Sequence, residues 1–108
     1  MQNPNLIKLY QIIDDFDDNK LYLIMQLADF GSLMEWKEEK LSYIINKKIY
    51  DIFKQKLTQQ FSNEREEREL IAKLIFKEIG KGLQFLHYKR IAHRDLKPDN
   101  ILGKSEGS

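Results

Sequence analysis

The sequence has no cysteine, which excludes disulfide bonds, thiolate catalysis and zinc–thiolate centres. Its two histidines, His87 and His93, are too few for a histidine-only metal cage. No apolar run approaches the length that crosses a bilayer, and the longest clean one is "LYLIM" at 21–25. The charges nearly cancel, because 17 Asp and Glu residues face 18 Lys and Arg residues, which leaves a net charge of +1. This balance gives no attraction to nucleic acid or anionic membranes, so we expect neither as a partner.

The chain has 108 residues, of which 42% are apolar and 32% are charged. This length and composition fit one domain or a piece of a larger one. The first residues, "MQNPN", do not have the charged and apolar regions of a secretory signal. We therefore expect a cytoplasmic protein, with the nucleus as the other option.

The first part of the chain predicts an antiparallel hairpin. Residues 5–14 and 21–27 are rich in Leu, Ile and Tyr, as strands are, and "DDFDDNK" at 14–20 is a turn cluster. The near-continuous apolar content of 21–27 predicts burial of that strand on both faces. The four turn acids favour an exposed turn over a cation site.

Beyond residue 33 the pattern is helical. Ser32 is a plausible cap for a helix that starts near Leu33. An apolar stripe at steps of three and four runs through 40–57, and 58–67 is a polar break. A cap at Ser62-Asn63 predicts a second helix with the stripe Leu70, Leu74, Ile75, Ile79, Leu83 and Leu86. Two glycines within it, Gly80 and Gly82, indicate close packing against a neighbour.

The string "HRDLKPDN" at 93–100 gathers cations, acids, a histidine, a proline and an amide. Asp95 and Asn100 offer oxygen ligands suited to Mg²⁺. In an extended segment Lys97 lies on the same face as Asp95, an arrangement that suits a phosphate donor facing a hydroxyl. The alternative is a solvated charged turn, and composition alone does not decide between them.

The exact string resembles the catalytic loop of eukaryotic protein kinases, H-R-D-L-x-x-x-N, at every fixed position. Lys97 and Pro98 match the serine/threonine subclass. The resemblance implies an α+β fragment of the two-lobed kinase fold. It divides into N-lobe strands (1–27), a hinge (28–33), a helix with a probable insertion (34–66), a long C-lobe helix (67–90) and the catalytic loop (91–102).

The resemblance also implies roles for individual residues. Asp95 would hold the acceptor hydroxyl in line with the γ-phosphate of ATP, Lys97 would neutralise charge on that phosphate, and Asn100 would hold Mg²⁺. Arg94 would pair with a phosphorylated activation loop, and His93 would be a packing residue. The adenine pocket would comprise the Met25 gatekeeper, the backbones of Gln26 and Ala28, and Leu102 beneath the ring, with Leu33 and Ile101 packed behind it.

Other kinase parts are not found in these residues: the Gly-rich loop, the V-A-I-K lysine with its glutamate, D-F-G and A-P-E. We therefore expect the 108 residues alone to be inactive and to bind ATP weakly. The function implied is a serine/threonine kinase, with ATP and a protein substrate carrying a Ser or Thr acceptor as partners. The alternative is a non-catalytic fragment that acts by protein binding. The sequence does not fix the oligomeric state.

Overall fold

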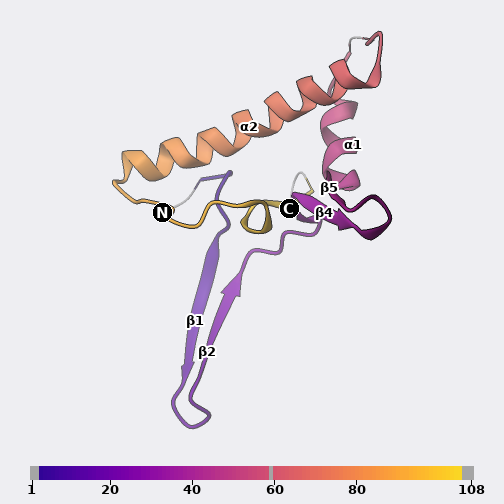
Figure 1. Ribbon diagram of the computed structural model, residues 1–108. Coiled ribbons are helices and arrows are strands. Elements are labelled where there is room, and N and C mark those ends of the chain that lie inside the picture. Colours follow the sequence, from indigo (N-terminus) through magenta and orange to yellow (C-terminus); the bar gives the residue numbers. More distant parts are fainter. Residues whose placement is uncertain (1–2, 59, 106–108) are drawn as a thin grey trace.

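The computed structural model describes residues 3–58 and 60–105. The described part has an α+β architecture of three two-stranded antiparallel sheets and two α-helices. The elements follow the order β1 (Leu9–Asp15), β2 (Lys20–Met25), β3 (Gly31–Ser32), β4 (Met34–Lys37), β5 (Ser42–Ile45), α1 (Lys47–Gln55), α2 (Glu64–Tyr88) and β6 (Leu102–Gly103). Short 3-10 helices, η1 (Glu38–Lys40) and η2 (Pro98–Asn100), lie between them. The molecule extends over 60 × 37 × 27 Å, because the β1–β2 hairpin projects away from both helices (Figure 1).

The predicted antiparallel hairpin is confirmed, with β1 paired to β2 from Leu9↔Met25 to Asp15↔Lys20. The Asp15 carboxylate accepts hydrogen bonds from the backbone N–H groups of Asp17 and Asp18 at 3.1 and 3.3 Å. The turn therefore uses this acid to satisfy its own backbone, as Asp does in turns. The described residues contain no group of three or more His, Asp or Glu side chains that could hold a metal ion.

The predicted burial of the second strand on both faces is wrong. Every residue of β2 is exposed, and so are the apolar residues of β1. The exposed apolar side chains of the hairpin are Leu9, Tyr10, Ile12, Ile13, Leu21, Tyr22, Leu23, Ile24 and Met25. Neither helix reaches over the hairpin, so nothing in the described part of the chain covers them (Figure 1).

The helix predicted from Leu33 through 34–66 is confirmed only at Lys47–Gln55, which form α1, and it is wrong before that. Residues 34–45 instead form the β4–β5 hairpin, in which Met34 pairs with Ile45 and Trp36 with Tyr43. The Trp36 and Tyr43 rings meet edge to face with centroids 5.1 Å apart. Aromatic and β-branched residues placed across from each other stabilise two strands, and this pairing overrides the helical spacing. Ser32 lies in β3 and caps no helix; α1 begins only at Lys47, after Asn46.

The long second helix is confirmed, and it spans Glu64–Tyr88 against the predicted 67–90. Asn63 is its N-cap, with the side-chain oxygen accepting from the backbone N–H of Glu66 at 3.0 Å. Three acids lie in the first turn, where the helix dipole favours negative charge. Among the described residues no helix is long and apolar enough to span a membrane.

A small core lies where β3, α1 and α2 meet. Its buried members are Leu33, Ile49, Ile71 and Ile75, and Ile71 is fully buried. The predicted stripe of the second helix included Ile75 but not Ile71. The prediction that the helix packs closely against a neighbour is confirmed at Gly82, because a Cβ there would lie 3.0 Å from the backbone oxygen of Asn5. For Gly80 the prediction is wrong, since nothing lies within 4 Å of its Cβ position.

Candidate active site

The segment with the candidate catalytic residues follows α2 directly. Helix α2 ends at Tyr88, and Arg90 turns the chain with a φ of 60°. The chain then runs back beneath α2 toward the base of the β1–β2 hairpin (Figure 1). All residues from 91 to 100 are exposed. The candidate residues are thus presented on an open surface at the junction of the hairpin and the helices.

Three predicted catalytic residues lie together. The Asn100 amide nitrogen donates to the Asp95 carboxylate at 3.0 Å and to the Asp95 backbone oxygen at 2.8 Å. The Lys97 ammonium lies 3.8 Å from the other carboxylate oxygen of Asp95. The η2 turn brings Asn100 back toward Asp95, and Pro98 at its start fixes φ there. The result is a carboxylate flanked by an amide and a cation, all facing solvent.

His93 and Arg94 fix the backbone conformation at Asp95. The Asp95 N–H donates to Nδ1 of His93 at 3.2 Å. Arg94 has a φ of 71°, in the left-handed region that non-glycine residues seldom adopt. Both side chains are exposed, so the expected packing role of His93 is not seen among the described residues. No ion pair of Arg94 occurs in that part of the chain, and its expected pairing with a phosphorylated loop stays a prediction.

The chain after Asn100 is anchored to the hinge region. Strand β6 pairs with β3, which places Gly103 opposite Gly31 and Leu102 opposite Ser32. Two flanking hydrogen bonds extend the pairing. The Phe30 N–H donates to the backbone oxygen of Gly103 at 3.0 Å, and the Leu33 N–H donates to the backbone oxygen of Ile101 at 2.7 Å. Leu33 is buried in the core, and Ile101 packs against that core. That these two residues pack behind Leu102 in an adenine pocket stays a prediction.

Gly103 allows this pairing to sit on α1. A Cβ at this position would lie 2.6 and 2.7 Å from Cγ1 and Cδ1 of Ile49. Only glycine therefore lets β6 lie this close to the buried face of α1.

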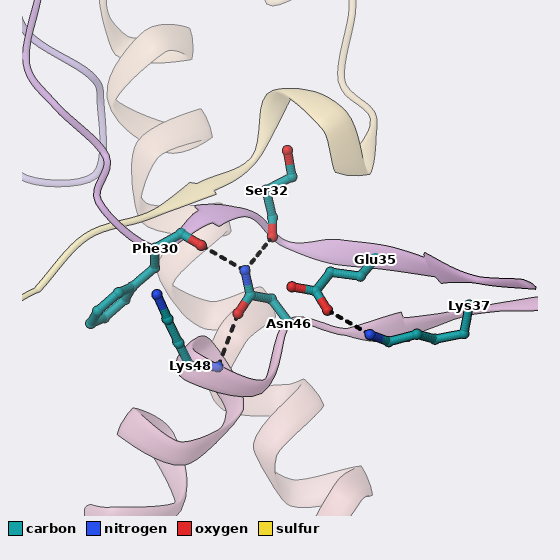
Figure 2. Close-up of polar contacts among 6 residues, drawn as sticks. All are labelled: Phe30, Ser32, Glu35, Lys37, Asn46 and Lys48. Carbon is teal, nitrogen blue, oxygen red and sulfur yellow. Dashed lines mark hydrogen bonds and ion pairs between the residues drawn. The ribbon is translucent and has the colours of Figure 1, made fainter.

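Asn46 holds the other side of β3 (Figure 2). Its amide nitrogen donates to the backbone oxygens of Phe30 and Ser32 at 2.6 and 3.0 Å, and its side-chain oxygen accepts from Lys48 N–H at 2.9 Å. Asn46 is the one buried polar side chain in the described residues, at 4% exposure. Sequence reasoning missed it. The available signal was an Asn directly before a run of helix formers, which indicates an N-cap.

The predicted adenine-binding residues lie along two separate stretches. Met25 ends β2 and is half exposed, and Gln26 and Ala28 follow it in the connection to β3. Within the described chain the Ala28 N–H and the Gln26 backbone oxygen have no hydrogen-bond partner, so both are available to a ligand. Leu102 lies across from Ser32, with 45% of its surface exposed. The connection through residues 26–30 links the two stretches.

A second contact ties the hinge to the end of the described chain. The Asp29 carboxylate accepts a hydrogen bond from Ser105 N–H at 2.8 Å, and this bond lowers the pKa of Asp29. A hollow of about 360 Å³ opens nearby between the N-terminal residues, Gln26 and Lys104. Of the predicted adenine-binding residues only Gln26 lines this hollow.

The comparisons agree with this geometry. The protein kinase domain model matches residues 1–108, so the chain belongs to the protein kinase domain family. A probable serine/threonine-protein kinase of Dictyostelium discoideum is 29% identical over 107 residues, which are 99% of this chain and 11% of the relative. The calcium/calmodulin-dependent protein kinase kinase of Caenorhabditis elegans is 31% identical over 94% of this chain and 14% of its own length.

A third relative, calcium-dependent protein kinase 5 of Plasmodium falciparum, is 34% identical over 94% of this chain and 13% of its own length. The chain thus spans 11–14% of the length of these curated relatives. No solved structure was found to match it. The family and its α+β fold are shown, and the serine/threonine kinases among its relatives agree with the subclass indicated by Lys97 and Pro98.

Proposed function

We propose that this chain is the central part of a protein serine/threonine kinase domain, which transfers the γ-phosphate of ATP to a protein hydroxyl. The observation that carries the proposal is the cluster of Asp95, Lys97 and Asn100, held at 3.0 and 3.8 Å by η2 and anchored through β6. The exact kinase catalytic-loop string at 93–100 distinguishes this cluster from an ordinary charged turn.

Each member of the cluster has a task in this chemistry. The Asp95 carboxylate accepts a hydrogen bond from the acceptor hydroxyl and orients its oxygen toward the phosphorus. The Lys97 ammonium offsets charge on the transferred phosphoryl group. Asn100 keeps the Asp95 carboxylate in place through its amide nitrogen. Positioning and neutralisation of this kind account for most of the catalysis in phosphoryl transfer.

Asn100 fits one ligand position of a Mg²⁺ ion. Both side-chain hydrogen bonds of Asn100 use its amide nitrogen, which leaves its side-chain oxygen for a cation. Mg²⁺ in nucleotide enzymes takes one or two protein oxygens and completes its shell with phosphate oxygens and water. Asn100 would supply one such oxygen. The bound ion would shield the negative charge of the phosphates.

For the nucleotide we propose a place between the connection after β2 and the Leu102 strand. The free Ala28 N–H and Gln26 backbone oxygen are a donor and an acceptor for one edge of an adenine ring. Half-exposed Met25 and Leu102 offer apolar contacts for the ring itself.

The test is phosphate transfer by the full natural protein that carries this chain. With labelled ATP, Mg²⁺ and a mixed Ser/Thr peptide library, we expect transfer that Asp95→Asn lowers about 100-fold or more. The control Asp99→Asn changes an exposed acid of the same segment and should retain activity within about threefold. Equal activity of wild type and Asp95→Asn would contradict the proposal.

The 108 residues alone should transfer no phosphate, because residues 91–100 and the hairpin are open to water. Catalysis by positioned charges depends on excluding that water. Asp95-dependent transfer by the isolated chain would contradict this expectation.

A second candidate function, protein binding without catalysis, rests on the exposed apolar faces of the β1–β2 hairpin. Apolar patches of this kind mark interaction surfaces in folded proteins. The two candidates separate in the same assay, since a non-catalytic binding protein would transfer no phosphate even as wild type.

A further inference from the structure

We propose that Asn46 is a positioning residue for the nucleotide site. The proposal rests on the kinase function proposed above. It assigns a role to a residue that lies 49 positions before Asp95, outside the kinase signature string, and whose side chain is hydrogen-bonded to none of the predicted site residues in the described chain.

The geometry of Asn46 goes beyond helix capping. A cap needs only the side-chain oxygen, which here accepts from Lys48 N–H. The amide nitrogen makes two further bonds, to the backbone oxygens of Phe30 and Ser32 (Figure 2). The Asn46 backbone N–H adds a third link, to the Leu33 oxygen at 2.7 Å. Every polar group of the buried side chain is therefore used, and two of its bonds fix β3 rather than α1.

Strand β3 is the only pairing partner of β6 within the described residues. Asn46 bonds the backbone oxygens on either side of Gly31, and β3 pairs with β6, which begins two residues after Asn100. A shift of the Phe30–Leu33 backbone would therefore move Leu102 and the end of the catalytic segment with it. Two residues on each strand make this a short sheet, and it has few other bonds to resist such a shift.

The design of the substitutions separates capping from positioning. Ser and Asp are as good N-caps as Asn, but neither carries an amide donor. Asn46→Ser and Asn46→Asp therefore keep the bond to Lys48 N–H and remove the two donated bonds to β3. Asn63→Ser is the matched control, because Asn63 caps α2 through its oxygen and its side chain makes no bond to a strand.

The first measurement is amide hydrogen exchange in the full natural protein. We expect Asn46→Ser and Asn46→Asp to speed exchange of the Phe30 and Leu33 amides about tenfold or more, because half-buried carbonyls lose their donors and the β3–β6 pairing loosens. Amides in the middle of α2, such as that of Ile75, should change less than about twofold. Asn63→Ser should leave the Phe30 and Leu33 amides unchanged.

The second measurement is steady-state kinetics with the same proteins. If Asn46 positions the nucleotide site, Asn46→Ser should raise KM for ATP about tenfold. KM for the protein substrate should change by less than about twofold. A purely structural loss would lower the folded fraction, so kcat would fall and KM for ATP would stay. Unchanged KM for ATP, or exchange that speeds equally over the whole molecule, overturns the proposal.

The two measurements also distinguish failure of the proposed function from failure of this inference. If the wild-type protein transfers no phosphate, the kinase function fails, and the exchange data alone decide whether Asn46 positions the β3–β6 sheet. If the wild type is active and Phe30 and Leu33 exchange as before in both Asn46 variants, only the role of Asn46 is refuted.

Discussion

At the scale of single residues, Gly103 couples the candidate site to the core. It follows Leu102 in β6, and its missing side chain leaves room for Ile49 of α1. A methyl group here would meet two side-chain atoms of Ile49 well inside van der Waals contact, so the Ile49 side chain, the strand or the helix must move. The same position therefore governs both stability and the placement of Leu102.

We predict that Gly103→Ala destabilises the full natural protein by about 1–3 kcal/mol, the usual cost of overpacking a core. The melting temperature falls, and KM for ATP rises because β6 is displaced. Gly80→Ala is the matched control: nothing lies near its Cβ position, and Ala is favoured over Gly within a helix by up to about 1 kcal/mol. A Gly103→Ala melting temperature equal to that of wild type would refute the steric argument.

The proximity of Asp95, Lys97 and Asn100 could be predicted from sequence because the three residues are close together along the chain. Asp95, Lys97 and Asn100 lie within six residues, so a single turn brings them together whatever the rest of the chain does. The role of Asn46 could not be predicted in this way. Its partners Phe30 and Ser32 are 16 and 14 residues away, and only the folding of the β4–β5 hairpin brings them into reach.

At the scale of elements, α1 and α2 are joined by a partly buried hydroxyl and a carboxylate. The Tyr50 hydroxyl donates to Glu67 at 2.7 Å, and the Lys54 ammonium lies 3.6 Å from the same carboxylate oxygen. Burial, and then the bond to Glu67, raises the pKa of Tyr50 to about 12. This link closes the helix pair beside the buried Ile49 and Ile71.

A stability change at high pH follows from that pKa. Because the folded-state pKa of Tyr50 lies above its ordinary value of 10.0, its contribution is complete below pH 10 and is lost as the pH rises through about 12. We predict that the free energy of unfolding falls over this window and that Tyr50→Phe removes most of the fall. Denaturant unfolding followed by circular dichroism measures both.

Tyr88→Phe, which changes an exposed tyrosine, is the control and should keep the fall. A Tyr50→Phe protein with the wild-type pH dependence would show that the α1–α2 link does not titrate in this way.

Element types were predicted best where one local signal dominates. The 25 residues of α2 carry a cap, first-turn acids and a long apolar stripe, and all three favour a helix. Residues 34–45 carry a helical spacing together with aromatic and β-branched residues that suit strands. Cross-strand pairing of Trp36 with Tyr43 decides the conflict, and sequence spacing alone does not contain that contact.

At the scale of the whole molecule, the β1–β2 hairpin is the least supported part. A two-stranded hairpin is marginal in water without a third strand or a covering helix. Its apolar faces are exposed, and its outer edges present unpaired backbone groups. We infer that another part of the natural protein, or a partner, covers it.

The hairpin yields a prediction about association. Ile12 and Leu23 are cross-strand neighbours and both are more than half exposed. In the isolated 108-residue chain, Ile12→Lys with Leu23→Glu should replace the apolar pair by an ion pair and reduce aggregation, as measured by light scattering. In the full natural protein the same two substitutions should lower the melting temperature, because they replace an apolar contact that is covered there by two charged side chains.

Phe16→Glu, at the exposed hairpin tip, is the control for adding charge without changing the Ile12–Leu23 pair. It should change aggregation of the isolated chain and the melting temperature of the full protein less than the double substitution does. If the paired substitution leaves the melting temperature of the full protein unchanged, this face of the hairpin is not covered there.

The sequence by itself determined what local chemistry fixes: the hairpin turn, the capped long helix, and the string at 93–100, in which Asp95, Lys97 and Asn100 meet through one short turn. It also determined the kinase resemblance that the family model confirms. Tertiary structure alone decided which apolar residues are buried, that residues 34–45 pair as strands, and that Asn46 and Gly103 hold the strands of the site. These depend on partners far along the chain, and the free energy of such contacts exists only once the chain has folded.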